Sequence, residues 1–231
     1  MVTRIILLTF AAETNKKGDN NMQEKYDFLK NPFDKLSKGE EKEFQRECAL
    51  IAQKLFDNYC ILCGEAKYYF AEVEFYYYEK GKWDDKWNEI TYARKVYNAG
   101  DLFYHLSGID ICFDSSYDDC NAKFGGVLIR AIKDEKGTVI AGPLTCKDEI
   151  LNACKGNQMP ILRPLSTPLR TDLTSTYRAL GKQDTDKEND RLCFYGRVND
   201  WNPIKDRYNT RKGLIERKQG TYKTDRFNDC Y

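Results

Sequence analysis

The sequence predicts an α+β domain, in which helices are interspersed with strands that are mostly not linked in βαβ units. Three stretches carry this prediction. Residues 37–58 place apolar side chains at helical spacing, residues 68–78 are an aromatic run typical of a strand, and residues 125–132 indicate a buried strand closed by a turn at 134–137. One compact domain accounts for 231 residues without internal repeats.

The first predicted helix follows a capping signal. Ser37 precedes Glu40 by three residues, a spacing that lets each side chain bond the other's backbone at a helix start. The apolar residues then recur on one helical face, at Phe44, Cys48, Ile51 and Leu55. We therefore expect an amphipathic helix that begins at Ser37.

The aromatic run "YYFAEVEFYYY", residues 68–78, has two glutamates in its middle. Side chains on a strand alternate between faces, which predicts one face of Ala71, Val73, Phe75 and Tyr77, and another of Phe70, Glu72, Glu74, Tyr76 and Tyr78. Acids are rarely buried. The second face is therefore either a solvated edge or a built cleft.

Weaker patterns fill the rest of the chain. Residues 101–114 predict one or two strands around Gly108, residues 145–154 a helix capped by Thr145, residues 173–181 a helix, and residues 207–227 edge strands. Residues 1–24 begin with a short apolar run and continue into a polar stretch, so we expect a flexible tail there and a single domain over residues 25–231.

Composition restricts the classes of partner only slightly. The formal net charge is +1, although residues 161–231 carry 15 basic against 10 acidic side chains, an excess that suits phosphate contacts or simply a solvated surface.

Nine scattered cysteines favour reduced thiols and a cytoplasmic or nuclear protein that is not secreted. Cys60 and Cys63 are three apart in an expected strand, so we predict two packed thiols and no metal site. No apolar run is long enough to span a membrane.

Three motifs occur in order: "AEVEFYYY", "GDLFYHLSGIDICFD" and "GGVLIRAIKDEKG". Over residues 45–140 the chain resembles the alkyladenine (3-methyladenine) DNA glycosylases, whose corresponding motifs are V-E-T-E-A-Y, a P-G-x-x-Y-V-Y-x-x-Y-G segment ending in Asn, and V-L-L-R-A. The resemblance includes a divergent branch with an E-x-E-F-Y-Y strand. It implies a curved, mostly antiparallel sheet flanked by helices, and a monomer that excises a damaged purine from double-stranded DNA without a cofactor.

The resemblance also implies roles for individual residues. Glu74 would activate the water that attacks the sugar, and Arg130 would lie beside it as the second catalytic residue. The base-binding pocket would be lined by Tyr76, Tyr104, His105 and Asp114. Basic residues of the C-terminal third, for example Arg207, Arg211 and Lys212, would grip DNA. Because no lysine lies on the active strand, we expect no lyase step.

The chain departs from the family's pattern at several positions. The intercalating tyrosine falls on Ser107, the pocket histidine has no counterpart other than Trp87 or His105, and Asp114 replaces an asparagine. Each residue also has a plainer interpretation. Glu72 and Glu74 can be exposed residues of an edge strand, Arg130 their structural counter-ion, and His105 a satisfied histidine beside the sheet. Two further functions stay open: a catalytically silent nucleic-acid-binding relative, and a nucleosidase or glycosidase that uses Glu72 with Glu74.

Overall fold

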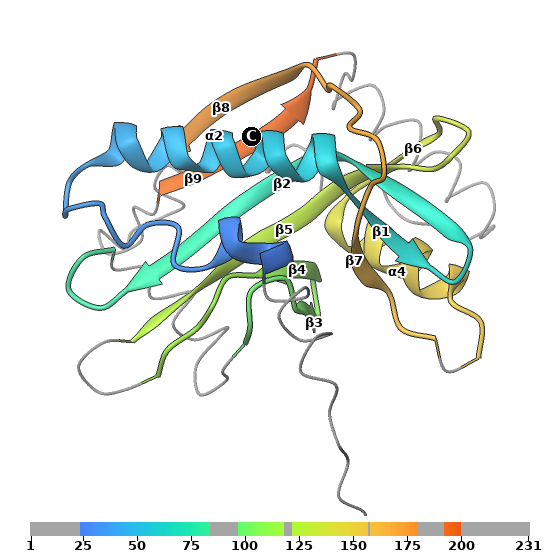
Figure 1. The fold of residues 1–231 in the computed structure, drawn as a ribbon, viewed down its shortest axis with the longest axis horizontal. Helices are drawn as coiled ribbons and strands as arrows, with labels where there is room; N and C mark the ends of the chain where they lie inside the picture. Colours follow the sequence, from blue (N-terminus) through green and yellow to red (C-terminus); the bar gives the residue numbers. More distant parts are fainter. Residues whose placement is uncertain (1–23, 84–96, 118–121, 157, 180–191, 200–231) are drawn as a thin grey trace, which may run out of the picture.

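The computed structural model describes residues 24–83, 97–117, 122–156, 158–179 and 192–199, in which two α-helices flank a curled antiparallel sheet (Figure 1). This arrangement confirms the predicted α+β class and its antiparallel sheet. Residues 1–23 of the expected tail and the expected edge strands at 207–227 lie outside the described residues.

The helical elements are a short 3-10 helix, η1 (Glu24–Leu29), and the α-helices α2 (Glu41–Asn58) and α4 (Pro143–Ala153). The strands are β1 (Tyr59–Cys63), β2 (Ala66–Glu79), β3 (Leu102–His105), β4 (Gly108–Cys112), β5 (Lys123–Lys133), β6 (Val139–Ala141), β7 (Ile161–Pro164), β8 (Leu173–Ala179) and β9 (Leu192–Val198). Among the described helices, none combines the length and apolar character needed to cross a membrane.

Strand β2 runs through the middle of the sheet. The strand order is β3-β4-β5-β2-β1-β7, with β6 added to β5, β9 to β2 and β8 to β9. Along Glu72–Phe75, β2 is paired with β5 on one side and with β9 on the other. The interpretation of Glu72 and Glu74 as exposed edge residues is therefore wrong, because both neighbouring positions are occupied and both side chains are buried.

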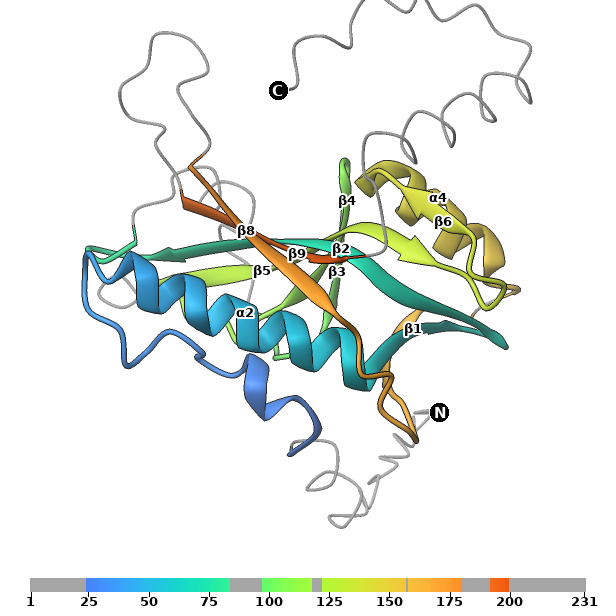
Figure 2. The same ribbon diagram turned by 90° about the horizontal axis from the view of Figure 1, so that it is seen from above.

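The main core lies between α2 and the sheet. Figure 2 shows α2 along one side of the sheet and α4 on the other. The buried face of α2 consists of Phe44, Cys48, Ile51, Ala52, Leu55 and Phe56, which confirms the predicted helical spacing. Tyr77 of β2 packs against Phe33, with ring centroids 4.6 Å apart. Strand β9 comes close to Ala52 of α2 at Gly196. Burial of these aromatic and aliphatic side chains fixes which face of β2 turns toward α2.

A bulge breaks the alternation that the sequence predicts for β2. The register passes from Phe70 paired with Ile132 to Glu72 paired with Ala131, so Ala71 has no partner in the β5 ladder. The extra residue turns Phe70 toward the helix, where its ring lies 5.8 Å from that of Phe56. The prediction that Phe70 shares a face with the two glutamates is therefore wrong.

Three element assignments also differ from expectation. Helix α2 begins after Glu40 and not after Ser37. Residues 37–40 form a separate turn, in which the Glu40 N–H bonds the Ser37 carbonyl at 3.2 Å and the Ser37 N–H bonds the Glu40 carboxylate at 2.5 Å. Helix α4 begins at Pro143, whose fixed φ suits the first helical position. The helix predicted near residues 173–181 is strand β8, since its β-branched and aromatic residues pair with β9.

Candidate functional site

The sheet face that turns away from α2 carries the candidate site, and we call it the site face. Directly paired residues of neighbouring strands point to the same side of a sheet. One row across this face contains Phe103 of β3, Asp110 of β4, Leu128 of β5 and Glu74 of β2. The next row contains Cys112, Gly126 and Tyr76. Acidic and aromatic side chains from separate strands therefore meet on one surface.

Two glutamates and two arginines form a buried network on the site face. Glu72 is 0% exposed and Glu74 is 1% exposed. Arg130 donates from Nε to Glu72 Oε1 at 2.8 Å and from Nη1 to Glu74 Oε2, while Arg197 Nε reaches Glu72 Oε2 at 3.0 Å. Two carboxylates are thus matched by two guanidiniums, which offsets much of the cost of taking the charges out of water.

A second irregularity, next to the bulge that displaces Phe70, positions Arg130. On β5, the register jumps from Ala131 to Ile129, so Arg130 lies outside the regular pairing with β2. Its backbone carbonyl accepts the Gly142 N–H at 2.8 Å instead, at the start of α4. A bulge re-aims side chains, and here one guanidinium reaches both Glu72 and Glu74.

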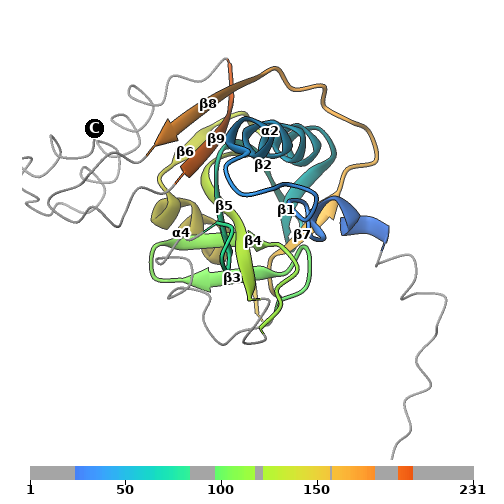
Figure 3. The same cartoon turned by 90° about the vertical axis from the view of Figure 1, so that its left-hand side faces the viewer.

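Beside this network, Asp110 pairs with His105 from the β3–β4 hairpin. His105 Nε2 lies 3.2 Å from Asp110 Oδ1, and the Ser107 N–H donates to His105 Nδ1 at 3.3 Å. The ring of Phe103 stacks on His105 with centroids 5.4 Å apart. Figure 3 shows this hairpin next to α4, and Lys147 of α4 donates to the His105 carbonyl at 2.8 Å.

The structure brings together four of the six residues predicted for catalysis and base binding. Glu74, Arg130, Tyr76 and His105 lie on the site face. Tyr104 does not, because it pairs with Ile109 and packs against the main core on the opposite side of β3. Its buried hydroxyl has no hydrogen-bond partner among the described residues, and burial raises the pKa of Tyr104 to about 12. The prediction that Tyr104 lines the pocket is therefore wrong.

Asp114 is also outside the candidate site. Its carboxylate accepts the Ala99 N–H at 2.5 Å, and its own N–H donates to the Leu29 carbonyl at 3.4 Å. These bonds hold the segment that follows β4, beyond the end of the strand. The predicted DNA contacts Arg207, Arg211 and Lys212 lie outside the described residues.

Sequence reasoning missed three residues of the site. Asp110 and Phe103 share the site face by strand alternation, and the apolar Ile109 and Ile111 on either side of Asp110 were the signal that could have identified it. Arg197 reaches Glu72 only because β9 pairs with β2, a contact between residues 125 positions apart. No local sequence pattern indicates that Arg197 belongs to the site.

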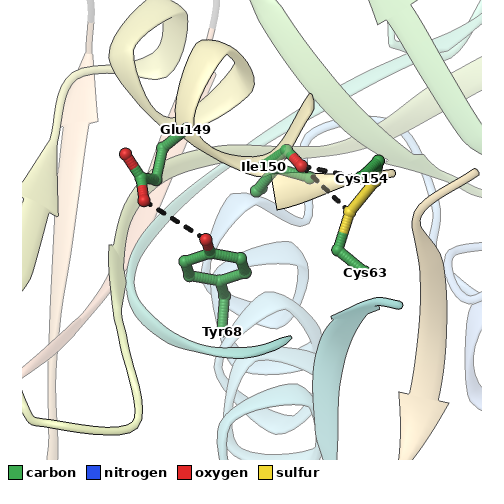
Figure 4. The surroundings of a disulfide bond; sticks show 5 residues. All are labelled: Cys63, Tyr68, Glu149, Ile150 and Cys154. Atoms are coloured by element: carbon green, nitrogen blue, oxygen red, sulfur yellow. Dashed lines mark hydrogen bonds between the residues drawn. A yellow bond between two sulfur atoms is a disulfide. The ribbon is translucent and has the colours of Figure 1, made fainter. Parts of the chain in front are cut away.

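The thiols take two different forms. Cys63 at the end of β1 forms a disulfide with Cys154 after α4, and the Ile150 carbonyl lies beside both sulfurs (Figure 4). The expectation of reduced thiols is wrong for this pair, while Cys60 is a buried free thiol as predicted.

Burial raises the pKa of the free thiol of Cys146, whose surroundings include Glu72 and Arg130, so a thiolate is disfavoured there. Within the described residues, no group of three or more His, Cys, Asp or Glu side chains is arranged to hold a metal ion.

Comparison with known proteins gives no relative: no family model, curated protein or solved structure matches the chain. A function can therefore be inferred only from the residues of the candidate site.

Proposed function

We propose that the chain is a DNA glycosylase that hydrolyses the N-glycosidic bond of a flipped alkylated or deaminated purine, with Glu74 activating the water. A base within a duplex has to leave the stack before a side chain can reach its glycosidic bond. The protein then needs a carboxylate near the sugar and a flat apolar surface for the base. Glu74 and Tyr76, two residues apart on β2, provide both groups on one face.

The contact between Arg130 and Glu74 is the observation that carries this proposal. The two residues belong to separate motifs, 56 positions apart in the chain, and the irregular pairing of β2 with β5 joins them. A charge-assisted bond of this kind fixes the direction of the carboxylate. A carboxylate can act as a general base only if it points at the proton that it removes, so its orientation is the first requirement.

The hairpin tip supplies a candidate for the side chain that enters the duplex. Ser107, where the family has an intercalating tyrosine, is preceded by Leu106, whose side chain is 91% exposed. Lys147 fixes the tip by donating to the Leu106 carbonyl at 3.0 Å. Proteins that unstack DNA frequently insert a leucine or another apolar wedge between bases. We therefore assign to Leu106 the intercalating role of the family's tyrosine, for which Ser107 is not suited.

The arrangement of Glu72 argues against the small-substrate alternative. A glycosidase that used Glu72 and Glu74 as its acid and base would need both carboxylates at the scissile bond. Both oxygens of Glu72 are bound by guanidiniums, from Arg130 and Arg197. Glu72 is therefore better placed to hold Arg130 than to transfer a proton.

The proposal is tested on labelled duplexes that contain a single hypoxanthine or a single methylated purine. Excision leaves an abasic site, which hot alkali converts into a strand break that a gel resolves. We expect cleavage by the wild-type protein and a loss of about 10²–10⁴-fold in Glu74→Gln, the range for removal of a general base. Glu79→Gln is the matched control, because Glu79 lies on the same strand and pairs with Lys82 and Tyr77 away from the network.

Two outcomes would reject the proposal. Excision by Glu74→Gln at the wild-type rate would show that Glu74 is a structural strand residue. Binding of the duplexes without excision by the wild-type protein would favour the silent-relative alternative.

A further inference from the structure

Helix α4 connects the disulfide to the tip of the β3–β4 hairpin. Directly after the helix, Cys154 is linked to Cys63 of β1. In the middle of the helix, Lys147 donates to the carbonyls of His105 and Leu106, at 2.8 and 3.0 Å. The covalent bond therefore lies about two helical turns from the side chain that holds the hairpin tip.

Apolar packing alone anchors this helix weakly. Among its eleven residues, only Cys146 and Ile150 are buried. Near the disulfide, the Tyr68 hydroxyl donates to the Glu149 carboxylate at 3.2 Å (Figure 4). Most helical stability in proteins comes from packing of a buried face, so a short helix with two buried side chains depends on its other anchors. The disulfide is the covalent one among them.

Both redox states of the pair fit this site. Cys63 is buried and Cys154 is half-buried, so a thiol from solution reaches the Cys154 sulfur first. The Ile150 carbonyl lies 2.9 Å from Cys63 Sγ and 3.4 Å from Cys154 Sγ. It is one of the last four carbonyls of α4, which lack partners within a helix. The reduced Cys63 thiol therefore has a hydrogen-bond acceptor in place.

The other described thiols differ from this pair. Cys48, Cys60, Cys112 and Cys146 are free and buried. Disulfides that form where most thiols stay reduced are usually transient or redox-sensing, whereas permanent ones are typical of small domains in oxidising compartments. The present domain has a large buried core and does not need such a cross-link in order to fold. A reversible bond between Cys63 and Cys154 therefore suits this protein.

We propose that Cys63 and Cys154 form a redox switch. The oxidised pair fixes α4 and, through Lys147, the hairpin tip, and reduction loosens both. The consequence for excision rests on the proposed glycosylase function, in which Leu106 at this tip enters the duplex.

A thiol such as glutathione is the reductant. Its thiolate bonds to Cys154 Sγ, the S–S bond breaks, and Cys63 Sγ leaves with the electron pair and takes up a proton. A second glutathione thiolate bonds to the glutathione sulfur of this mixed disulfide, and Cys154 leaves as a thiolate, which is then protonated. Two electrons thus pass to the protein, and the products are oxidised glutathione and two protein thiols.

Hydrogen exchange followed by mass spectrometry measures the loosening without any substrate. Amide exchange reports the local opening of each segment. In the reduced wild-type protein we expect exchange to become about tenfold faster or more in peptides of α4 and of residues 102–112. Peptides of α2 should exchange at the same rate in both forms. Faster exchange in α2 as well would identify a general structural cross-link and overturn the switch, as would an unchanged hairpin.

Three variants separate the steps. Cys154→Ser should exchange like the reduced wild-type protein, with or without reductant. Cys60→Ser is the matched control, because Cys60 is a free thiol on the same strand, and it should respond to reduction as the wild type does. In Lys147→Met the hairpin should exchange rapidly in both redox states, while α4 should still respond to reduction. A hairpin that keeps its redox response in Lys147→Met would contradict the connection through this lysine.

Alkylation in buffers with graded ratios of reduced to oxidised glutathione measures whether the bond is reversible. We expect the linked form at the oxidised end of the series and two alkylated cysteines at the reduced end. A pair that stays linked in reduced glutathione alone would be a permanent structural bond, and this result would overturn the switch.

Excision of hypoxanthine by the two forms connects the switch to the proposed function. The reduced form should excise the base about fivefold more slowly or less, the range of a modest coupling between two sites. Equal rates in the two forms would overturn the inference and leave the glycosylase proposal standing. Absence of excision in both forms would overturn the proposed function, while hydrogen exchange would still decide whether the hairpin responds to the disulfide.

Discussion

Replacement of Arg130 by methionine should strongly destabilise the protein. The change removes the guanidinium from Glu74, which is 1% exposed, and leaves Glu72 with its bond to Arg197. Loss of one partner of a buried ion pair costs about 3–5 kcal/mol, because the other charge stays buried without compensation. A domain with a stability of about 5–15 kcal/mol can lose this amount and still be largely folded in many cases.

Urea denaturation followed by circular dichroism measures the effect. With a slope of about 2 kcal/mol per molar urea, the midpoint should fall by about 1.5–2.5 M. Arg130→Lys keeps the charge but loses the fork that contacts both carboxylates, so we expect a smaller loss of about 1.5–3 kcal/mol. Glu74→Gln added to Arg130→Met should recover about 2 kcal/mol or more, because the buried charge that has lost its bond to Arg130 is gone. A loss below about 1 kcal/mol in Arg130→Met would refute the buried network.

Three further outcomes are expected. Gly125→Ala should cost about 1–3 kcal/mol in a thermal melt, because the new Cβ would lie 2.4 Å from the Tyr76 carbonyl oxygen, and an unchanged melting temperature would contradict that close approach. Tyr104→Phe should leave excision unchanged and keep or raise stability, because it removes a buried hydroxyl without a described partner, and a selective loss of excision would return Tyr104 to the site. Peptide mapping without reductant should recover Cys63 linked to Cys154, and alkylation of both in the native protein would exclude the disulfide.

Local patterns predicted the parts of the fold that depend on local physics. The spacing of apolar residues identified the buried face of α2, and alternation placed Glu72, Glu74 and Tyr76 together on β2. The bulge at Ala71 could not be predicted in this way, because it is set by the pairing of β2 with β5. A shift of one residue exchanges the two faces of a strand, and Phe70 therefore moved to the core.

The same sensitivity explains the errors at the site. The resemblance predicted Tyr104 for the pocket, but the β3–β4 pairing places Phe103, one residue earlier, beside Asp110. Arg197 and the partner of Cys63 depend on contacts across 125 and 91 residues, respectively. Nine cysteines do not reveal their connectivity through spacing. Contacts between residues so far apart in the sequence form only in the assembled sheet, so local sequence patterns do not predict them.

The assignment of Glu74 as the base and Glu72 as its structural support is tested most directly by single-turnover excision of hypoxanthine by Glu74→Gln and Glu72→Gln. Rates are divided by the folded fraction of each variant, because both substitutions disturb the contacts of Arg130. We predict a rate about 10²–10⁴-fold below wild type for Glu74→Gln, and within about tenfold of wild type for Glu72→Gln. Equal losses in the two variants, or a larger loss in Glu72→Gln, would contradict the assignment.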